Sequence, residues 1–104
     1  MQIVIAPGTL KTGITESEML AASDRFQDEF VVHQPGVLQR VLVTDGSGRY
    51  ADIVLFADEQ AVADVMAAEQ TSLVCAAFME MWDGDVPTMH EVLRTYGAGL
   101  PTGA

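Results

Sequence analysis

The sequence predicts an α+β domain whose elements follow the order β-α-β-β-α-β. The first observation is a pair of apolar runs, 37–44 and 50–57, joined by a short loop that includes two glycines. Glycine takes the positive φ angles that a tight antiparallel connection needs, so these runs predict a β-hairpin. The second observation is that segments of helical periodicity, 15–31 and 58–69, flank this hairpin on both sides.

Short polar signals mark where each helix begins. Thr15 and Glu18 have the spacing of a capping box, in which each side chain satisfies a free backbone amide. Asp58 is the predicted N-cap of a second helix through about residue 69, and a further short helix is expected to begin near Ser72. The first helix carries an apolar stripe that is expected to lie on a sheet: Met19, Ala22, Phe26 and Phe30.

The two outer strands are less sharply marked than the hairpin. The first begins as the apolar run 2–6 and is expected to continue to residue 11 with a bend or bulge at Pro7 and Gly8. The segment 83–85 is expected to end the short third helix, so the last strand is predicted over 86–96. The domain is therefore assigned to residues 1–97, followed by a Gly-rich tail, 98–104, that is expected to be flexible.

Both hairpin strands are mostly apolar on both faces, which is typical of a sheet covered above and below. Two helices on one side of a four-stranded antiparallel sheet give the ferredoxin-like arrangement, which covers one face only. Soluble monomers rarely expose an apolar patch of several hundred Å2. The sequence therefore predicts a ferredoxin-like protomer, with an extra short helix before the last strand, that forms a homodimeric α/β barrel.

Composition excludes several functions. The chain of 104 residues is long enough for one domain with a real core. Its 15 acidic residues outnumber 5 basic ones, which argues against nucleic acid and anionic lipid as partners. No run is long enough for a membrane span, and the N-terminus lacks the pattern of a signal peptide, so a cytoplasmic location is expected. One cysteine and two histidines give no metal-ligand spacing, and no cofactor is expected.

Several short motifs carry a resemblance to a known family. They are Gly13-Ile14-Thr15-Glu16, Gln34-Pro35-Gly36-Val37, the hairpin turn from Asp45 to Val54, and Ser72-Leu73-Val74-Cys75-Ala76-Ala77-Phe78. In order and character they resemble the dimeric α/β-barrel superfamily, which includes antibiotic-biosynthesis-monooxygenase-like proteins. The resemblance spans about nine tenths of the chain by order of elements. It implies two protomers with their sheets face to face, and a ligand pocket between sheet and helices or near the barrel mouth.

The chain departs from the family pattern in one respect. Members that oxidise polyphenols without a cofactor, and those that degrade haem, commonly use an asparagine in their polar sets. This sequence contains no asparagine. The departure makes both activities less expected, because the amide that would orient a substrate oxygen or O2 is missing.

Three residues are the candidates for catalysis. His90, in the predicted last strand, has an imidazole that could act as a general base, although a structural hydrogen bond is the simpler interpretation. Asp52 lies in a strand covered on both faces and needs a partner, for which Arg40 on the neighbouring strand is the natural choice. A four-residue hairpin loop would place these two on opposite faces, whereas a three-residue bulged loop would bring them together. A structural ion pair and a ligand-orienting pair both remain open.

The remaining reactive side chains favour structural interpretations. Cys75 has no neighbouring histidine in the sequence and is expected to be an inert thiol, and His33 is expected to cap the end of the first helix. Tyr50 and Trp82 are expected to edge a small pocket with the three catalytic candidates.

Two functional classes follow from this set of residues. The first is a small-molecule enzyme or binder for an apolar aromatic or carbonyl compound, resembling a cofactor-independent monooxygenase. In it His90 would move a proton, Asp52 would orient the ligand, and Arg40 would stabilise a developing oxyanion. The alternative is a non-catalytic dimeric binding or stress-related module.

Overall fold

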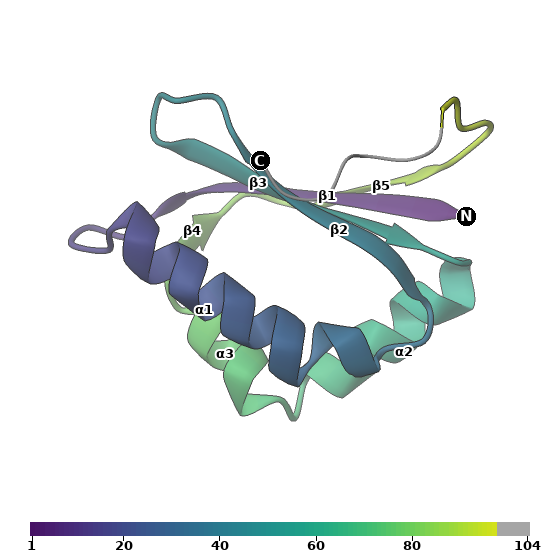
Figure 1. The fold of residues 1–104 in the computed structure, drawn as a ribbon, viewed down its shortest axis with the longest axis horizontal. Coiled ribbons are helices and arrows are strands. Elements are labelled where there is room, and N and C mark those ends of the chain that lie inside the picture. The colour runs from purple at the N-terminus through teal and green to yellow at the C-terminus, as the bar shows by residue number, and fades with distance from the viewer. Residues whose placement is uncertain (98–104) are drawn as a thin grey trace.

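The computed structural model describes residues 1–97, and the predicted tail 98–104 lies outside them (Figure 1). The strands are β1 (Gln2–Leu10), β2 (Val37–Thr44), β3 (Arg49–Phe56), β4 (Trp82–Gly84) and β5 (Thr88–Glu91). The helices are α1 (Glu16–Glu29), the short 3-10 helix η1 (Val31–His33), α2 (Glu59–Glu69) and α3 (Leu73–Met79). The predicted α+β order is confirmed.

One antiparallel sheet organises the molecule. Its order is β2-β3-β1-β4, and β5 pairs with the same edge of β1 as β4 does. All three α-helices lie on one side of this sheet, and Figure 1 shows them below it. As expected, β1 continues past Pro7 and Gly8, and it ends at Leu10. Of the expected bend or bulge, the bulge is wrong, because β1 pairs with β3 in one continuous register from Gln2 to Thr9.

The helices begin where the sequence places their caps. The capping box is complete: Glu18 N donates to Thr15 Oγ1 at 3.1 Å, and Thr15 N donates to Glu18 Oε1 at 3.3 Å. Asp58 accepts from Ala61 N at 2.8 Å, and Ser72 accepts from Cys75 N at 3.1 Å. Each side chain satisfies an amide that the first helical turn leaves free, so these three starts are determined locally.

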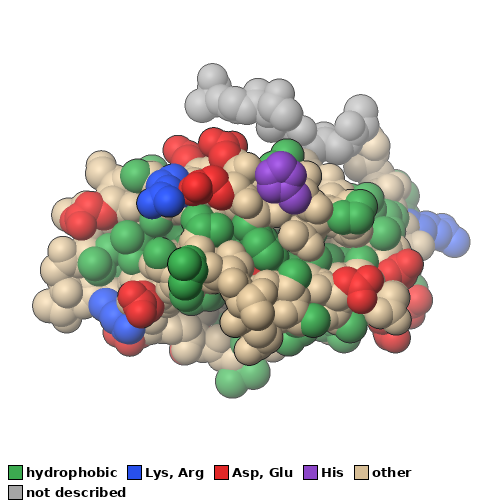
Figure 2. Space-filling view, turned by 90° about the horizontal axis from the view of Figure 1, so that it is seen from below, with side chains coloured by type: hydrophobic (Ala, Val, Ile, Leu, Met, Phe, Trp, Pro, Cys, Tyr) green, Lys and Arg blue, Asp and Glu red, His purple; other side chains and the backbone are tan. Residues whose placement is uncertain are grey.

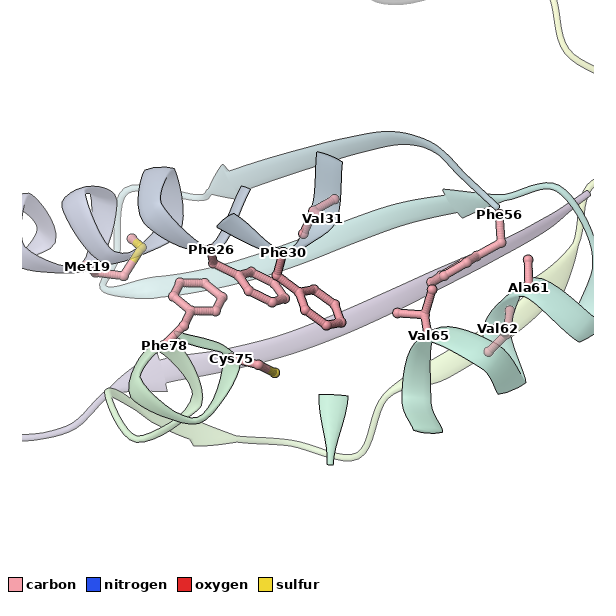
Figure 3. Packing of buried hydrophobic residues seen from close by; sticks show 10 residues of the cluster. All are labelled: Met19, Phe26, Phe30, Val31, Phe56, Ala61, Val62, Val65, Cys75 and Phe78. Atoms are coloured by element: carbon pink, nitrogen blue, oxygen red, sulfur yellow. The ribbon is translucent and has the colours of Figure 1, made fainter. Parts of the chain in front are cut away.

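The hydrophobic core lies between the sheet and the helices (Figure 3). It has two parts. Phe26 of α1 and Phe30, the C-cap residue of α1, lie beside Phe78 of α3. The ring centroid of Phe26 is 5.4 Å from that of Phe30 and 5.3 Å from that of Phe78. The other part joins the end of β3 to α2 through Phe56, Ala61, Val62 and Val65. Seen from below in Figure 2, hydrophobic side chains run through the middle of the molecule's surface and acidic ones gather toward its margins.

The last strand differs from its prediction. It begins at Trp82, not at residue 86, and it is split into β4 and β5. Gly8 and Ile5 of β1 are three positions apart, but their partners Gly84 and Thr88 are four positions apart. One extra residue is therefore accommodated around Pro87, which has no N–H to donate to the ladder. Because side chains alternate between the two faces of a strand, each side chain of β5 lies on the opposite face from the one that a continuous strand from Trp82 would give it.

The face of the sheet away from the helices has no cover in the described protomer (Figure 1). Its central side chains are apolar and partly exposed: Ile3, Ile5, Val41, Val43, Ile53 and Leu55. The prediction that the hairpin is apolar on both faces is thus confirmed. In residues 1–97 no single helix meets the length and apolarity needed to cross a membrane, and α2 with α3 meets them only as a pair bent by 92°.

Candidate functional site

A cavity of about 450 Å3 lies between the two parts of the core, under the sheet. This volume is within the range of small-molecule sites, and most of the lining is apolar. Three charged side chains interrupt it: Arg40 from β2, Asp52 from β3 and Glu69 from α2. The remaining lining residues are Val4, Ala6, Phe26, Phe30, Val31, Val37, Val54, Phe56, Val62, Val65, Met66, Met79, Pro87, Thr88 and Met89.

The cavity reaches the surface beside three methionines. Met66 of α2, Met79 of α3 and Met89 of β5 line it, and each is about half exposed, at 59, 49 and 52%. Methionine is unbranched and adapts its shape to a neighbouring molecule. These three side chains therefore form a deformable entrance between the last strand and the second and third helices.

Arg40 and Asp52 form the buried ion pair that the sequence suggested. Arg40 Nε donates to both carboxylate oxygens of Asp52, at 3.0 and 3.1 Å, and the two side chains are only 8 and 13% exposed. The other guanidinium nitrogens donate to Ser23 of α1, Nη1 to its carbonyl oxygen at 3.3 Å and Nη2 to its hydroxyl at 2.8 Å. The guanidinium carbon also lies 5.0 Å from the Phe26 ring centroid.

The hairpin register explains why these two residues meet. Thr44 pairs with Tyr50, so five residues separate the paired positions, where the prediction considered four or three. With an odd number of residues between them, even-numbered residues of β2 pair with even-numbered residues of β3. Arg40 therefore pairs with Val54, which is the next residue after Asp52 on the same face of the sheet. Burial raises the pKa of Asp52, and the Arg40 charge and hydrogen bonds oppose that rise.

Glu69, at the end of α2, is a cavity residue that the sequence analysis missed. Its Oε2 is 3.5 Å from Cys75 Sγ, and no cation lies within salt-bridge distance of it among residues 1–97. Burial raises the pKa of Glu69, the Cys75 hydrogen bond opposes the rise, and the charge of Asp52 adds to it. One signal was present in the sequence: Glu69 follows Val62 and Val65 on the inward helical face.

Cys75 is a structural thiol. It is 3% exposed, and burial, followed by the charge of Glu69 and its hydrogen bond, raises the pKa of the thiol to about 12. A thiol that stays protonated at neutral pH is a poor nucleophile. The structure therefore agrees with the prediction that Cys75 is inert.

Tyr50 and Trp82 lie together but do not line the cavity. Their ring centroids are 5.8 Å apart in an edge-to-face arrangement, and Trp82 meets Phe78 in the same way at 5.7 Å. The Tyr50 hydroxyl donates a hydrogen bond to Glu16 Oε1 at 2.9 Å. The indole N–H of Trp82 is buried and has no hydrogen-bond partner within residues 1–97. These two residues extend the core toward the start of α1.

His90 lies on the other side of the sheet from Asp52. It pairs with Ile3 of β1, and paired residues share a face, whereas Asp52 pairs with Ala6. His90 is exposed. The one-residue shift before β5 is the cause, because a continuous register from Trp82 would have turned His90 toward the helices. The structure thus brings Arg40 and Asp52 together and separates His90 from them.

His33 is the last residue of η1, is exposed and does not line the cavity. Among residues 1–97, no group of three or more His, Cys, Asp or Glu side chains is arranged to hold a metal ion. The polar chemistry of the cavity therefore rests on Arg40, Asp52 and Glu69.

The arrangement of sheet and helices is found in other solved structures. SnoaB from Streptomyces nogalater, described as a cofactor-independent oxygenase, superposes with a TM-score of 0.74 at 17% identity, over 90% of this chain and 94% of that one. A protein from Chloroflexus aurantiacus J-10-fl, described as a putative antibiotic biosynthesis monooxygenase, gives a TM-score of 0.72 at 12% identity, covering 94 and 98% of the two chains. This chain has the fold of the antibiotic biosynthesis monooxygenases.

A third structure binds a large ring system. It is a mutant of MhuD, described with two manganese protoporphyrin IX molecules in each active site, and it gives a TM-score of 0.65 at 16% identity over 94% of this chain and 100% of that one. No protein-family model and no curated protein matches this sequence. At these identities the likeness concerns the fold and carries no activity over to this chain.

Proposed function

We propose that this protein binds a small apolar aromatic or carbonyl compound in the cavity and oxygenates it with O2 without a cofactor. The observation that carries the proposal is the 450 Å3 apolar cavity with the Arg40–Asp52 pair in its wall. The shared fold of a cofactor-independent oxygenase supports the reaction class. Because the sequence contains no asparagine, the proposal gives Arg40 the role that a side-chain amide would have at the substrate oxygen. The proposal differs from the sequence prediction in that His90 is not part of the site.

The reaction asks the protein for charge stabilisation rather than for a redox group. An electron-rich substrate such as a hydroquinone supplies all the electrons. One oxygen atom of O2 is added to the ring, the other leaves as water, and the ring becomes a hydroxyquinone. Negative charge develops on the substrate oxygen as it loses its proton. Arg40, a permanent cation in a low-dielectric wall, stabilises that charge, and Asp52 holds the guanidinium in place.

The test uses naphthohydroquinone and isotopically labelled O2. We expect the protein to accelerate O2 uptake above the spontaneous rate and to yield hydroxynaphthoquinone that carries one labelled oxygen atom. The double variant R40M/D52L removes both charges without leaving one buried alone, so it is expected to fold and to lose at least about tenfold of the rate. H90A, altered on the opposite face, is the matched control and is expected to keep the rate. A folded double variant with the wild-type rate would contradict the proposal.

A homodimer is part of this proposal. The uncovered apolar face of the sheet supports it, because water contact with that much apolar surface is unfavourable and a second copy supplies a complementary sheet. The cavity lies on the opposite face, toward the helices, so each protomer holds a complete cavity.

A non-catalytic binding module is the second candidate. One observation favours it: all three guanidinium nitrogens of Arg40 already have partners within the protomer. If that engagement is purely structural, the protein should bind naphthol in the cavity but leave the oxidation rate of naphthohydroquinone at its spontaneous value. The same labelled-oxygen experiment therefore separates the two functions.

A further inference from the structure

We propose that the cavity selects an uncharged ligand with an aromatic or enolic hydroxyl group, and that Glu69 accepts the hydrogen bond of that hydroxyl. The inference deepens the proposed function, on which it rests for the presence of a small-molecule ligand. It assigns a role to the one charged cavity residue that lacks an opposite charge within residues 1–97, and it excludes anionic ligands.

Arg40 is a poor site for a ligand that arrives as an anion, because Asp52 already compensates its charge. The Nε of Arg40 is shared by the two oxygens of Asp52, and its other nitrogens donate to the Ser23 carbonyl and hydroxyl oxygens. Two of the five guanidinium N–H groups have no partner among residues 1–97, but a ligand carboxylate or phosphate that reached them would also lie close to the Asp52 carboxylate. Repulsion by Asp52 therefore offsets much of the attraction that Arg40 would exert on such an anion. The charge that develops during the proposed reaction is a different case, since Glu69 takes up the proton and the total charge of the cavity does not change.

Glu69, in contrast, can accept a hydrogen bond from a ligand. It lines the cavity, and its only side-chain hydrogen bond among residues 1–97 is the long one at 3.5 Å between Oε2 and the Cys75 thiol. A thiol is a weak donor, so the carboxylate retains most of its accepting capacity. A donor brought in by a ligand would satisfy a group that burial leaves poorly solvated.

The charges that face Glu69 set the preferred ligand. The charged neighbours are Asp52 from β3 and Arg40 from β2, and the uncharged ones are Cys75 from α3 and Met89 from the last strand. Arg40 and Asp52 neutralise one another, which leaves the ionised cavity with one excess negative charge. An anion is therefore repelled, while a hydroxyl donates to Glu69 without bringing a charge out of water. An ammonium would be attracted, but burying it among apolar side chains carries a larger desolvation penalty.

The same contact supplies the first step of the proposed reaction. The O–H bond of the ligand breaks, its proton moves to a carboxylate oxygen of Glu69, and the electron pair stays on the ligand oxygen. No electron leaves the ligand in this step. The raised pKa of Glu69, which burial and Asp52 cause, makes the carboxylate a stronger proton acceptor than one in water.

The test measures binding by titration calorimetry with four naphthalene probes: naphthol, unsubstituted naphthalene, naphthoate and naphthylmethylammonium. We expect naphthol to bind tightest of the four. E69Q should lower its affinity roughly tenfold, as expected for a hydrogen bond to a charged acceptor, and should leave naphthalene unchanged. E80Q removes an exposed carboxylate from the end of α3 and is the matched control, with no expected change. Naphthol affinity should also weaken as pH falls through the pKa of Glu69, in the wild type but not in E69Q.

Each contrary result overturns the inference. Equal naphthol affinity in E69Q and wild type removes the role of Glu69, and tighter binding of naphthoate or of the ammonium probe removes the proposed ligand class. Absence of binding by all four probes removes both. If naphthol binding depends on Glu69 and naphthohydroquinone is still not oxygenated, the reaction under the proposed function fails while this inference stands.

Discussion

At the scale of single residues, Glu69 and Asp52 are carboxyl groups whose pKa values are raised by burial. For such a group the folded state holds the proton more tightly than the unfolded chain does. Its contribution to stability is fully present below the unfolded pKa and is lost as pH rises through the folded pKa. Ionisation of either carboxyl therefore lowers the stability of the folded state at neutral pH, relative to its protonated form.

The first prediction concerns E69Q. Because the variant removes the charge that burial disfavours, its free energy of unfolding at pH 7 should exceed that of the wild type, by less than about 1 kcal/mol since Glu69 is partly exposed. The difference should shrink as pH falls toward 4.5, the ordinary pKa of the group. Urea denaturation across this pH range measures it, with E80Q to correct for the general loss of negative charge. A wild type more stable than E69Q at pH 7 would contradict the assigned burial.

The second prediction concerns the thiol of Cys75. With a pKa of about 12 and 3% exposure, it should react with a disulfide reagent at pH 8 on the order of a hundredfold more slowly in the folded protein than in urea. Ser47 in the hairpin loop is exposed, so the variant S47C should show one fast and one slow thiol. Equal rates for both thiols would mean that α3 does not bury Cys75 stably.

At the scale of elements, the contact between β1 and β4 depends on the absence of a side chain at Gly8. A Cβ at this position would lie 2.9 Å from the carbonyl oxygen of Asp83 and 3.1 Å from the Cα of Gly84, both of which are backbone atoms of β4. The paired Gly84 has open space instead, because a Cβ added there would meet no atom of the described chain within 4 Å.

These two glycines give the third prediction. G8A should lower the free energy of unfolding by about 1–3 kcal/mol, because β4 must move away from β1 to relieve the contact. G84A should change it by no more than about 1 kcal/mol, since neither space nor a positive φ opposes a side chain there. Urea denaturation of both variants checks the difference, and equal destabilisation by the two would show that β4 does not pack on β1 in this register.

The helix starts and the hairpin could be predicted from the sequence, because residues close together in the chain determine them. The capping box at Thr15 and the caps at Asp58 and Ser72 act within one helical turn, and the hairpin is defined by its own loop. The last strand could not be predicted in the same way. Its start at Trp82 and the shift before Thr88 depend on pairing with β1, which lies at the other end of the described chain.

The same distinction applies to the candidate site. The need of Asp52 for a cation followed from its strand, so Arg40 could be predicted as its partner. The face of His90 depended on a one-residue shift in a distant pairing and could not be predicted from alternation alone. Glu69 was missed because a glutamate at a helix end is usually solvated, and only the position of the cavity makes it an inward residue.

At the scale of the whole molecule, the sheet separates two apolar surfaces with different uses. The surface toward the helices is divided by the cavity, and its charged groups come from β2, β3 and α2. The surface on the other side carries apolar side chains across β1, β2 and β3 and has no helix over it (Figure 1). A change on the uncovered face should therefore affect association without changing the cavity directly.

The fourth prediction tests this separation. Wild-type protein should sediment as a dimer at micromolar concentration, and I53E should shift it to an 11.2 kDa monomer, because the variant places a charge at the centre of the uncovered face. L73E introduces the same charge at an 88% exposed position on α3 and should leave the dimer intact. Each chain carries a formal charge of −10, so dimerisation should strengthen as added salt screens the repulsion between copies. The uncovered face is not the contact between copies if the wild type sediments as a monomer at every salt concentration, or if I53E dimerises as the wild type does. Naphthol binding by the I53E monomer would show that the cavity of a single protomer is complete.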